Sequence, residues 1–217
     1  MKISIIPLED DSEVFVDCTN PILNSVVDTV RQAFGSEMTR EDIIAHLKNP
    51  QKRYLATDDS GRIAAMAGYS QHLILGSHLL FVDGVAIHPD FQGAGLFREL
   101  TNMALENEEF IGLRTQNPRM YRAIEKISQG GICPSASCQH LREGTEKELK
   151  RLCAIKNALC AKVGFSVDFQ GVIRGCYGRS LYGEVPQHNR TTPLFQEVLK
   201  VNYERGDSVV CVGRLKI

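Results

Sequence analysis

Apolar residues recur at helical spacing near the start of the chain. Between residues 20 and 34 they lie three or four positions apart, at Ile22, Leu23, Val26, Val27, Val30 and Phe34. Asn20 can cap this helix, Pro21 suits its first turn and Gly35 ends it. The same spacing predicts a second helix from Thr39 to Asn49, which ends before Pro50.

Strand-like segments follow. β-branched and other apolar residues dominate residues 53–57, 62–75 and 79–88. The sequence between the first two is Asp-Asp-Ser-Gly and that between the last two contains Gly76, and both favour tight turns. We therefore predict three antiparallel strands joined by tight turns, preceded by a short strand at residues 2–6.

A glycine-rich segment, Gln92-Gly93-Ala94-Gly95, follows the third strand and opens a helix. The apolar residues of that helix lie on one face, at Leu96, Phe97, Leu100, Met103 and Ala104. A helix N-terminus offers unpaired N–H groups and a positive dipole, and glycines let an anion approach the backbone. A strand, a glycine loop and a helix are thus typical of a phosphate site, with the N–H groups of residues 93–97 as donors. The Gly-Lys-Ser/Thr sequence of P-loop nucleotide sites is absent.

The second half of the chain has weaker signals. A strand is predicted over residues 110–115, and a helix starts at Asn117-Pro118 and stops at Gly130-Gly131. Residues 132–144 are typical of a loop. Thr145 and Glu148 have the spacing of a capping box for a helix that runs to Val163. Residues 165–182 suggest a glycine-punctuated strand region, and a short helix near 194–202 and a strand at 208–215 close the chain.

Composition excludes several classes of protein. The 217 residues are 43% hydrophobic and 24% charged, which is ordinary for one globular domain and unlike disordered or fibrous chains. Lys and Arg number 25 against 26 Asp and Glu, so no net field favours nucleic acid or an anionic membrane. No apolar run approaches the ~20 residues of a membrane span, and the N-terminus lacks a secretory h-region. A cytoplasmic protein with one domain over residues 1–217 is expected.

The cysteines do not suggest a disulfide framework. Their number is seven, which is odd, and their spacing is irregular. Reduced, mostly buried thiols are the expectation. Cys133, Cys138 and His140 lie close in sequence, but their spacing matches no zinc pattern, so no metal is expected.

The segment from Val82 to Phe97 resembles the acetyl-CoA binding motif of the GCN5-related N-acetyltransferase (GNAT) superfamily. The matching features are a strand that ends in Val-x-Ile-His-Pro-Asp-Phe and the Gln-Gly-x-Gly-Leu that follows it. The order of elements over residues 20–128 agrees as well. The resemblance implies an α/β fold of the α+β type: a mixed, mostly antiparallel central sheet flanked by helices. The core would lie at about 20–128, and the acceptor side, with a C-terminal helix and strand extension, at about 132–217.

The resemblance also implies a set of residues that bind acetyl-CoA. They are the backbone of the strand end, the glycine loop with the helix start, and the cap of the next helix: Val85, Ala86, Ile87, Gln92, Gly93, Ala94, Gly95, Leu96, Phe97 and Asn117. Phe97 departs from the family, which has Gly or Ala there, and its ring must turn into the core. Two alternatives stay open, that Gly93 and Gly95 form only a tight turn and that Asn117 is only an N-cap.

The implied reaction is direct acetyl transfer to a primary amine, which needs a base for the ammonium and an acid for the leaving thiolate. The family often carries the acid as Tyr in a Tyr-Glu-Lys sequence, but here the sequence is Ile124-Glu125-Lys126. Tyr121, one turn earlier, is the substitute acid, or else a packing residue; Tyr177 and Tyr182 are weaker candidates.

The candidate base lies on the strand before the glycine loop. Histone-type members of the family carry Glu two residues before the position of Asp83, and this chain has Phe81 there. Period-two alternation puts Phe81 and Asp83 on one face of the strand, so Asp83 could accept the proton directly or through water. The alternative is a structural aspartate paired with a nearby donor.

The acceptor is a small-molecule or peptide amine of unidentified structure. Residues 165–182 would help to wall it, and Arg174 or Arg179 could select a carboxylate or phosphate unless they are solvated surface charges. The C-terminal extension could support a homodimer. A different class of function is a catalytically silent CoA-binding or acyl-CoA-binding sensor or interaction domain; a third is a structural protein whose glycine loop binds nothing.

Overall fold

The computed structural model describes residues 2–9, 20–135 and 143–216. Contacts divide the chain into two compact units, which are treated separately below. Unit 1 comprises residues 1–70 and 82–106, and unit 2 comprises residues 71–81 and 107–217. The hairpin of β3 (Ile63–Ile74) and β4 (Ser77–Ile87) contributes one part to each unit. A single domain over residues 1–217 stays a prediction.

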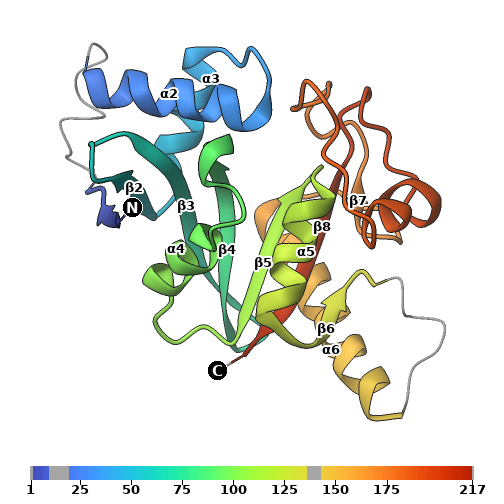
Figure 1. The fold of residues 1–217 in the computed structure, drawn as a ribbon. Coiled ribbons are helices and arrows are strands. Elements are labelled where there is room, and N and C mark those ends of the chain that lie inside the picture. The colour runs from blue at the N-terminus through green and yellow to red at the C-terminus, as the bar shows by residue number, and fades with distance from the viewer. Residues whose placement is uncertain (1, 10–19, 136–142, 217) are drawn as a thin grey trace. The chain divides into compact units, whose positions relative to one another are not determined.

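Unit 1 has the helices and strands that the sequence predicts (Figure 1). The elements are β1 (Ile3–Pro7), α2 (Pro21–Phe34), α3 (Arg40–Lys48), β2 (Lys52–Asp58), parts of β3 and β4, the 3₁₀ turn η1 (Pro89–Phe91) and α4 (Leu96–Ala104). The Asn20 side chain accepts from the N–H of Ile22, and that of Thr39 accepts from the N–H of Asp42. The predicted N-caps of both helices are therefore confirmed.

Strands β2 and β3 of the sheet in unit 1 are buried on both faces. β1 pairs with β2 and β2 with β3, all antiparallel, and Tyr54 of β2 lies opposite Ala67 while Leu55 lies opposite Met66. Leu55 and Met66 join the core that α2 and α3 cover. On the other face, the Tyr54 hydroxyl donates to the carbonyl of Met103, at 3.1 Å, and holds the end of α4. The strand alternation thus separates the two helical layers.

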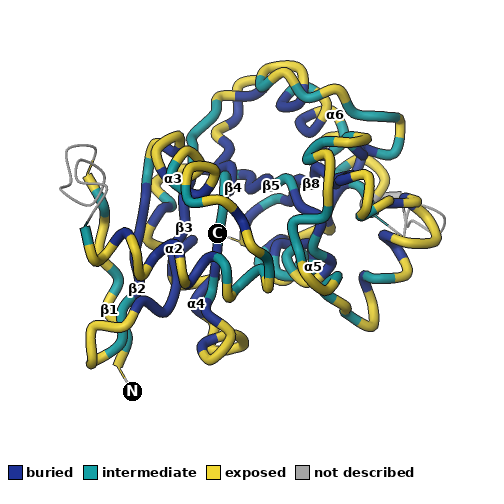
Figure 2. The backbone as a smooth tube through the Cα atoms, turned by 90° about the horizontal axis from the view of Figure 1, so that it is seen from above, coloured by how far each residue is buried: buried dark blue, intermediate teal, exposed yellow. Residues whose placement is uncertain are grey.

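Unit 2 is built on strands contributed by distant segments. Its further elements are β5 (Phe110–Thr115), α5 (Pro118–Ile127), β6 (Ser128–Cys133), α6 (Glu143–Val163), β7 (Val172–Ile173), the short π-helix η3 (Leu194–Val198) and β8 (Ser208–Leu215). In hydrogen-bonding order β4, β5, β8 and β6 are neighbours, and β7 also pairs with β8. β8 is antiparallel to each of its described partners β5, β6 and β7. Figure 2 shows β5 and β8 as buried strands.

Three predictions for this half of the chain are wrong. Residues 128–133, read as the end of a helix and a loop, form β6, because β8 supplies a partner that the local sequence cannot show. Residues 165–182 form only the two-residue strand β7 and are otherwise mainly turns. α6 begins at Glu143, so Thr145 lies inside the helix and is not its cap.

The expectation of reduced thiols is also wrong at one pair. Cys133 at the end of β6 and Cys153 on α6 form a disulfide, and Cys160, Cys176 and Cys211 are free thiols. α6 packs its apolar face on Phe110 and Val212, and Cys133 belongs to the same core. The bridge therefore links a helix and a strand that already share a core. Cys18, Cys138 and His140 lie outside the described residues.

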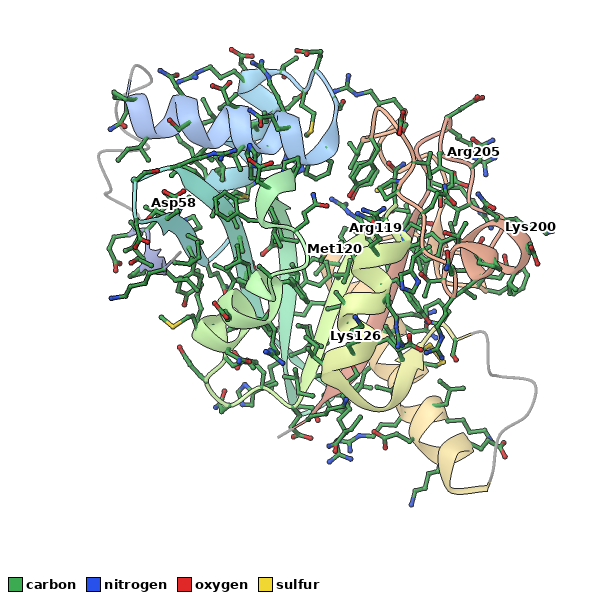
Figure 3. All side chains as sticks on the ribbon, in the orientation of Figure 1. Asp58, Arg119, Met120, Lys126, Lys200 and Arg205 are labelled. Carbon is green, nitrogen blue, oxygen red and sulfur yellow. A yellow bond between two sulfur atoms is a disulfide. The ribbon has the colours of Figure 1, made fainter. Side chains whose placement is uncertain are left out.

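The loops before β8 are organised around a buried carboxylate. The Asp207 side chain is 0% exposed and accepts hydrogen bonds from Arg174, from Arg205, at 2.7 Å, and from the N–H groups of Gly175 and Asn202. Arg205 is labelled among these loops in Figure 3. Burial alone would raise the pKa of Asp207, but these donors lower it well below its usual range. Arg174 also pairs with Asp168, so the suggested substrate-binding arginine serves the fold.

Among the described residues, no helix is long and apolar enough to cross a membrane. In the same residues no group of three or more His, Cys, Asp or Glu side chains is arranged to hold a metal ion.

Candidate functional site

The glycine loop of unit 1 adopts the backbone conformation that only glycine takes easily. Gly93 has φ +82° and Gly95 has φ +86°, both in the left-handed region. Gly95 is the N-cap of α4, and no side chain caps that helix. A Cβ atom built on Gly93 or Gly95 would meet nothing within 4 Å, so the space in front of the loop is open.

This geometry leaves backbone donors at the start of α4. The first N–H groups of a helix have no partner within it, and here no side chain takes that role. The N–H of Ala94 donates to the carbonyl of Phe91 instead, at 3.4 Å, so the donors on offer are those of Gly95, Leu96 and Phe97. Residues 92–95 are exposed. The arrangement suits an anion with several oxygens, such as a pyrophosphate.

The ring of Phe97, which stands where the family has Gly or Ala, points into the core as expected. Its side chain is 8% exposed and so turns into the core of unit 1. Its carbonyl accepts a hydrogen bond from the Thr101 hydroxyl within α4. The bulky ring therefore leaves the N-terminal face of the helix clear.

Arg62, the residue just before β3, holds the segment that precedes the glycine loop. The Arg62 guanidinium bonds to the His88 ring, at 2.8 Å to Nε2, and pairs with Asp90 at 2.6 Å. It also lies over the Phe91 ring, 5.4 Å from its centroid. The hydrogen bond from Arg62 holds the pKa of the exposed Asp90 carboxyl below its ordinary value. Arg62 was not among the predicted site residues, because only the folded hairpin brings it to the loop.

The end of β4 has one half-buried and one buried face. Val85 and Ile87 are half-buried, whereas Ala86 between them is 2% exposed and belongs to the core. The Gln92 side-chain amide donates to the carbonyl of Ile87, at 3.1 Å. Gln92 thus folds back on the strand and fixes the turn between β4 and the loop.

Asp83 lies on the same half-buried face of β4 as Val85 and Ile87. Its Oδ2 accepts a hydrogen bond from the Ser70 hydroxyl, at 2.6 Å. Ser70 was also missed in the sequence, although counting back from the turn at Gly76 would have placed it near Asp83 across the hairpin. The carboxylate is thus oriented by a neutral donor.

The candidates in unit 2 have identified partners. The Asn117 side chain accepts from the N–H of Arg119, at 2.8 Å, which makes Asn117 the N-cap of α5, and its amide donates to the Tyr182 hydroxyl, at 3.3 Å. Arg119, labelled at the first turn of α5 in Figure 3, donates from Nε to the carbonyl of Gln187. Burial raises the pKa of Tyr182. The capping alternative for Asn117 is therefore present in the structure, and its contact with a cofactor stays a prediction.

Tyr121 packs inside unit 2. Its side chain is 2% exposed and its ring meets that of Phe195 edge to face, with centroids 5.8 Å apart. Its hydroxyl donates to the carbonyl of Pro134. Tyr177, a weaker candidate for the acid, accepts a hydrogen bond from Arg114, and burial raises its pKa. The catalytic role of Tyr121 stays a prediction.

A comparison with protein families gives a match over the part of the chain that contains the glycine loop. The model of the acetyltransferase (GNAT) family matches residues 20–123, which include β4, the loop and α4. No curated protein matches the chain. Acetyl-CoA, the acetyl donor that this family uses, contains the pyrophosphate that the start of α4 suits.

Similar solved structures share low sequence identity with the chain. The ribosomal-protein-S18-alanine N-acetyltransferase of Escherichia coli is 14% identical, with 100% of this chain and 96% of that chain covered and a TM-score of 0.45. YhbS of Escherichia coli, a GNAT family N-acetyltransferase in complex with CoA, is 17% identical, with 56% and 67% covered and a TM-score of 0.40.

A GCN5-related glucosamine N-acetyltransferase region of a fungal multi-domain GH3 β-N-acetylglucosaminidase is 16% identical, with a TM-score of 0.44. The match covers 80% of this chain and 18% of that one. Similarities of this size do not identify an activity, since one fold hosts many. Residues 20–123, just under half of the chain, resemble the acetyltransferase (GNAT) family, whose model they match.

Proposed function

We propose that the protein is an N-acetyltransferase that moves an acetyl group from acetyl-CoA to a primary amine by direct attack. The observation that carries the proposal is the open glycine loop at a helix start without a side-chain cap. The family match over residues 20–123 supports it. The acceptor would be a small molecule or a peptide with an amine. We also propose that the protein is cytoplasmic and forms a homodimer.

The residues of unit 1 would hold the cofactor in two places. The N–H groups of Gly95, Leu96 and Phe97 would bind the pyrophosphate, with Gly93 giving it access. The backbone of Val85–Ile87 would pair with the pantetheine arm in the manner of an added strand. Gln92, which bonds the carbonyl of Ile87, would set the spacing between these two places. Bound acetyl-CoA would supply the activated thioester.

Asp83 would accept the proton that the attacking amine loses, directly or through water, while the Ser70 hydroxyl orients its carboxylate. A backbone N–H near Val85 would polarise the thioester carbonyl. Tyr121 would protonate the leaving thiolate only after giving up its bond to Pro134. A thiol leaves readily as a thiolate, so turnover does not require this acid.

A negative charge placed in the glycine loop should weaken the binding of acetyl-CoA. Ala94 is exposed and its φ is not positive, so Ala94→Asp adds a carboxylate without straining the backbone. We expect acetyl-CoA affinity to fall at least about tenfold, roughly 1.4 kcal/mol, because the added charge repels the phosphates. Isothermal titration calorimetry measures this directly.

The matched control is Ala154→Asp, the same substitution at an exposed position of α6 in unit 2. It should bind acetyl-CoA as the native chain does. Equal affinities of the native chain and Ala94→Asp would place the cofactor elsewhere.

A catalytically silent CoA-binding domain is the second candidate, and the burial of Tyr121 together with its bond to Pro134 favours it. Release of free CoA thiol from acetyl-CoA, with a panel of amines, separates the two. If the protein binds acetyl-CoA but no amine raises the rate of thiol release above the rate without amine, the protein is a catalytically silent CoA-binding domain.

A further inference from the structure

Arg114 on β5 has an unusual set of neighbours within unit 2. It is half-buried and lies opposite Val210 of β8 in the sheet. Its guanidinium carbon is 4.9 Å from the centroid of the Phe165 ring and 5.0 Å from that of the Tyr177 ring. Its Nε donates to the Tyr177 hydroxyl, at 3.1 Å. Two aromatic rings and one hydrogen bond therefore fix the orientation of the guanidinium.

These contacts leave one hydrogen-bonding edge of the guanidinium for another group. The fork has five N–H donors, and the bond from Nε uses one of them. Within residues 2–9, 20–135 and 143–216, the two terminal nitrogens of Arg114 have no hydrogen-bond or ion-pair partner. The edge formed by these two nitrogens matches the spacing of the two oxygens of a carboxylate.

Five other arginines of unit 2 differ from Arg114, because each reaches a carboxylate of the same unit, whereas Arg119 donates to the carbonyl of Gln187. The five are Arg122 with Glu125, Arg151 with Glu109, Arg174 with Asp168 and Asp207, Arg205 with Asp207, and Arg214 with Glu148. Arg151 is the closest comparison, since its guanidinium also lies on an aromatic ring, 5.0 Å from the centroid of Phe110. Arg151 donates from one terminal nitrogen to Ser77 and Glu109, whereas Arg114 donates only from Nε, to Tyr177, among the described residues.

The aromatic cluster beside Arg114 continues into the buried core of unit 2. The ring of Phe165 is 6.2 Å from that of Phe81 on β4, and Phe81 is 6.0 Å from the ring of His72 on β3. Phe81 is the residue at the position where histone-type members of the family carry Glu. Phe165 and Tyr177 are only half-buried, so they place apolar surface beside one fixed cation. Such a combination suits an apolar molecule that carries one anionic group.

We propose that Arg114 binds a carboxylate of the amine acceptor, and that Phe165 and Tyr177 cover the adjoining apolar part of that molecule. The inference rests on the proposed acetyltransferase function and narrows its acceptors to amines that carry a carboxylate. Arg114 thus replaces Arg174 as the residue proposed to select a carboxylate, because Asp168 and Asp207 already pair with the guanidinium of Arg174.

The test uses direct binding of product-like probes, which needs no turnover. The probes are N-acetylglycine, N-acetyl-L-leucine and N-acetyl-L-phenylalanine, each compared with its carboxamide by ligand-observed NMR and calorimetry. In the native chain at least one acid should bind about tenfold or more tighter than its amide, because only the acid offers two anionic oxygens to the fork. Arg114→Met should remove this difference, and Arg114→Lys should retain only part of it.

Arg151→Met is the matched control, since it removes an arginine that also lies on an aromatic ring but that already pairs with a carboxylate, Glu109. It should keep the preference for the acid. Thermal unfolding of all three variants shows that a lost preference is not a lost fold, and Arg114→Lys, which keeps the charge and the stem, covers the case in which Arg114→Met is unstable.

Three results would overturn the proposal. They are equal binding of acids and amides by the native chain, no binding of any acid, and an unchanged preference in Arg114→Met. A fourth contrary result is that Arg114→Met weakens acetyl-CoA and not the acids, since the fork would then serve a phosphate of the cofactor. Acetyl-CoA calorimetry on the native chain tests the proposed function separately, so the two can fail independently.

Discussion

Asp207→Asn is expected to lower the free energy of unfolding by about 3 kcal/mol, because a neutral amide replaces a buried carboxylate that accepts several charge-assisted hydrogen bonds. The side chain is fully buried and accepts from Arg174 and Arg205 as well as from two backbone N–H groups. Asparagine would keep the shape but leave both guanidinium groups without their buried counter-charge. Urea unfolding at pH 7 measures the change.

The matched control is Glu204→Gln, an exposed carboxylate in the same loop, which should change stability by less than about 0.5 kcal/mol. Similar losses for Glu204→Gln and Asp207→Asn would show that the network does not depend on the buried charge.

The same carboxylate predicts a pH dependence. The folded-state pKa of Asp207 is lowered, so its contribution to stability is present above the unfolded pKa of about 3.9 and declines as pH falls towards the folded value. The stability difference between the native chain and Asp207→Asn should therefore be full at pH 6 and smaller at pH 3. A difference that stays constant over this range would contradict the assignment of the charge to Asp207.

Asp83→Asn is expected to reduce kcat about 100- to 1,000-fold, within the roughly 100- to 10,000-fold that a general base usually contributes. Asparagine keeps the size of the side chain and can still accept from Ser70, but it cannot take up the proton of the amine. Acetyl-CoA affinity should stay within about twofold, because the phosphates are bound by the start of α4. The assay is CoA thiol release with the best acceptor from a panel of amino acids, tyramine and spermidine.

Two further variants serve as comparisons for Asp83→Asn. Ser70→Ala should have a smaller effect, about three- to tenfold in kcat, because it removes only the group that orients the carboxylate. Asp28→Asn, at an exposed position of α2, should leave kcat unchanged. Native turnover by Asp83→Asn would rule out Asp83 as the base and leave it as a structural partner of Ser70.

Elements with strong local signals could be predicted from the sequence. Asn20 and Thr39 cap their helices as expected, since caps depend on residues within one turn. β6 could not be predicted, because Gly130 and Gly131 interrupt its pattern and its partner β8 lies about 80 residues later in the chain. The turns of residues 165–182 were likewise misread, since long-range partners such as Asp207 shape them.

At the candidate site, the glycine loop could be identified from the sequence, but the side chains that hold the neighbouring residues in place could not. Gly93 and Gly95 have a local signature, because only their backbone conformation is at issue. The bonds of Arg62 to His88 and of Ser70 to Asp83 join different strands or loops and need the folded hairpin. Helical spacing placed Tyr121 near a turn of α5 but could not show that its hydroxyl meets Pro134.

The most direct test of the central claim is an ¹⁵N-resolved NMR titration of the native chain with acetyl-CoA. The account predicts that the largest amide shifts fall on Gly93, Gly95, Leu96 and Phe97, and that they are absent in Ala94→Asp under the same conditions. Saturable binding that leaves these amides unmoved, or no binding at all, would contradict the claim that the start of α4 holds the cofactor.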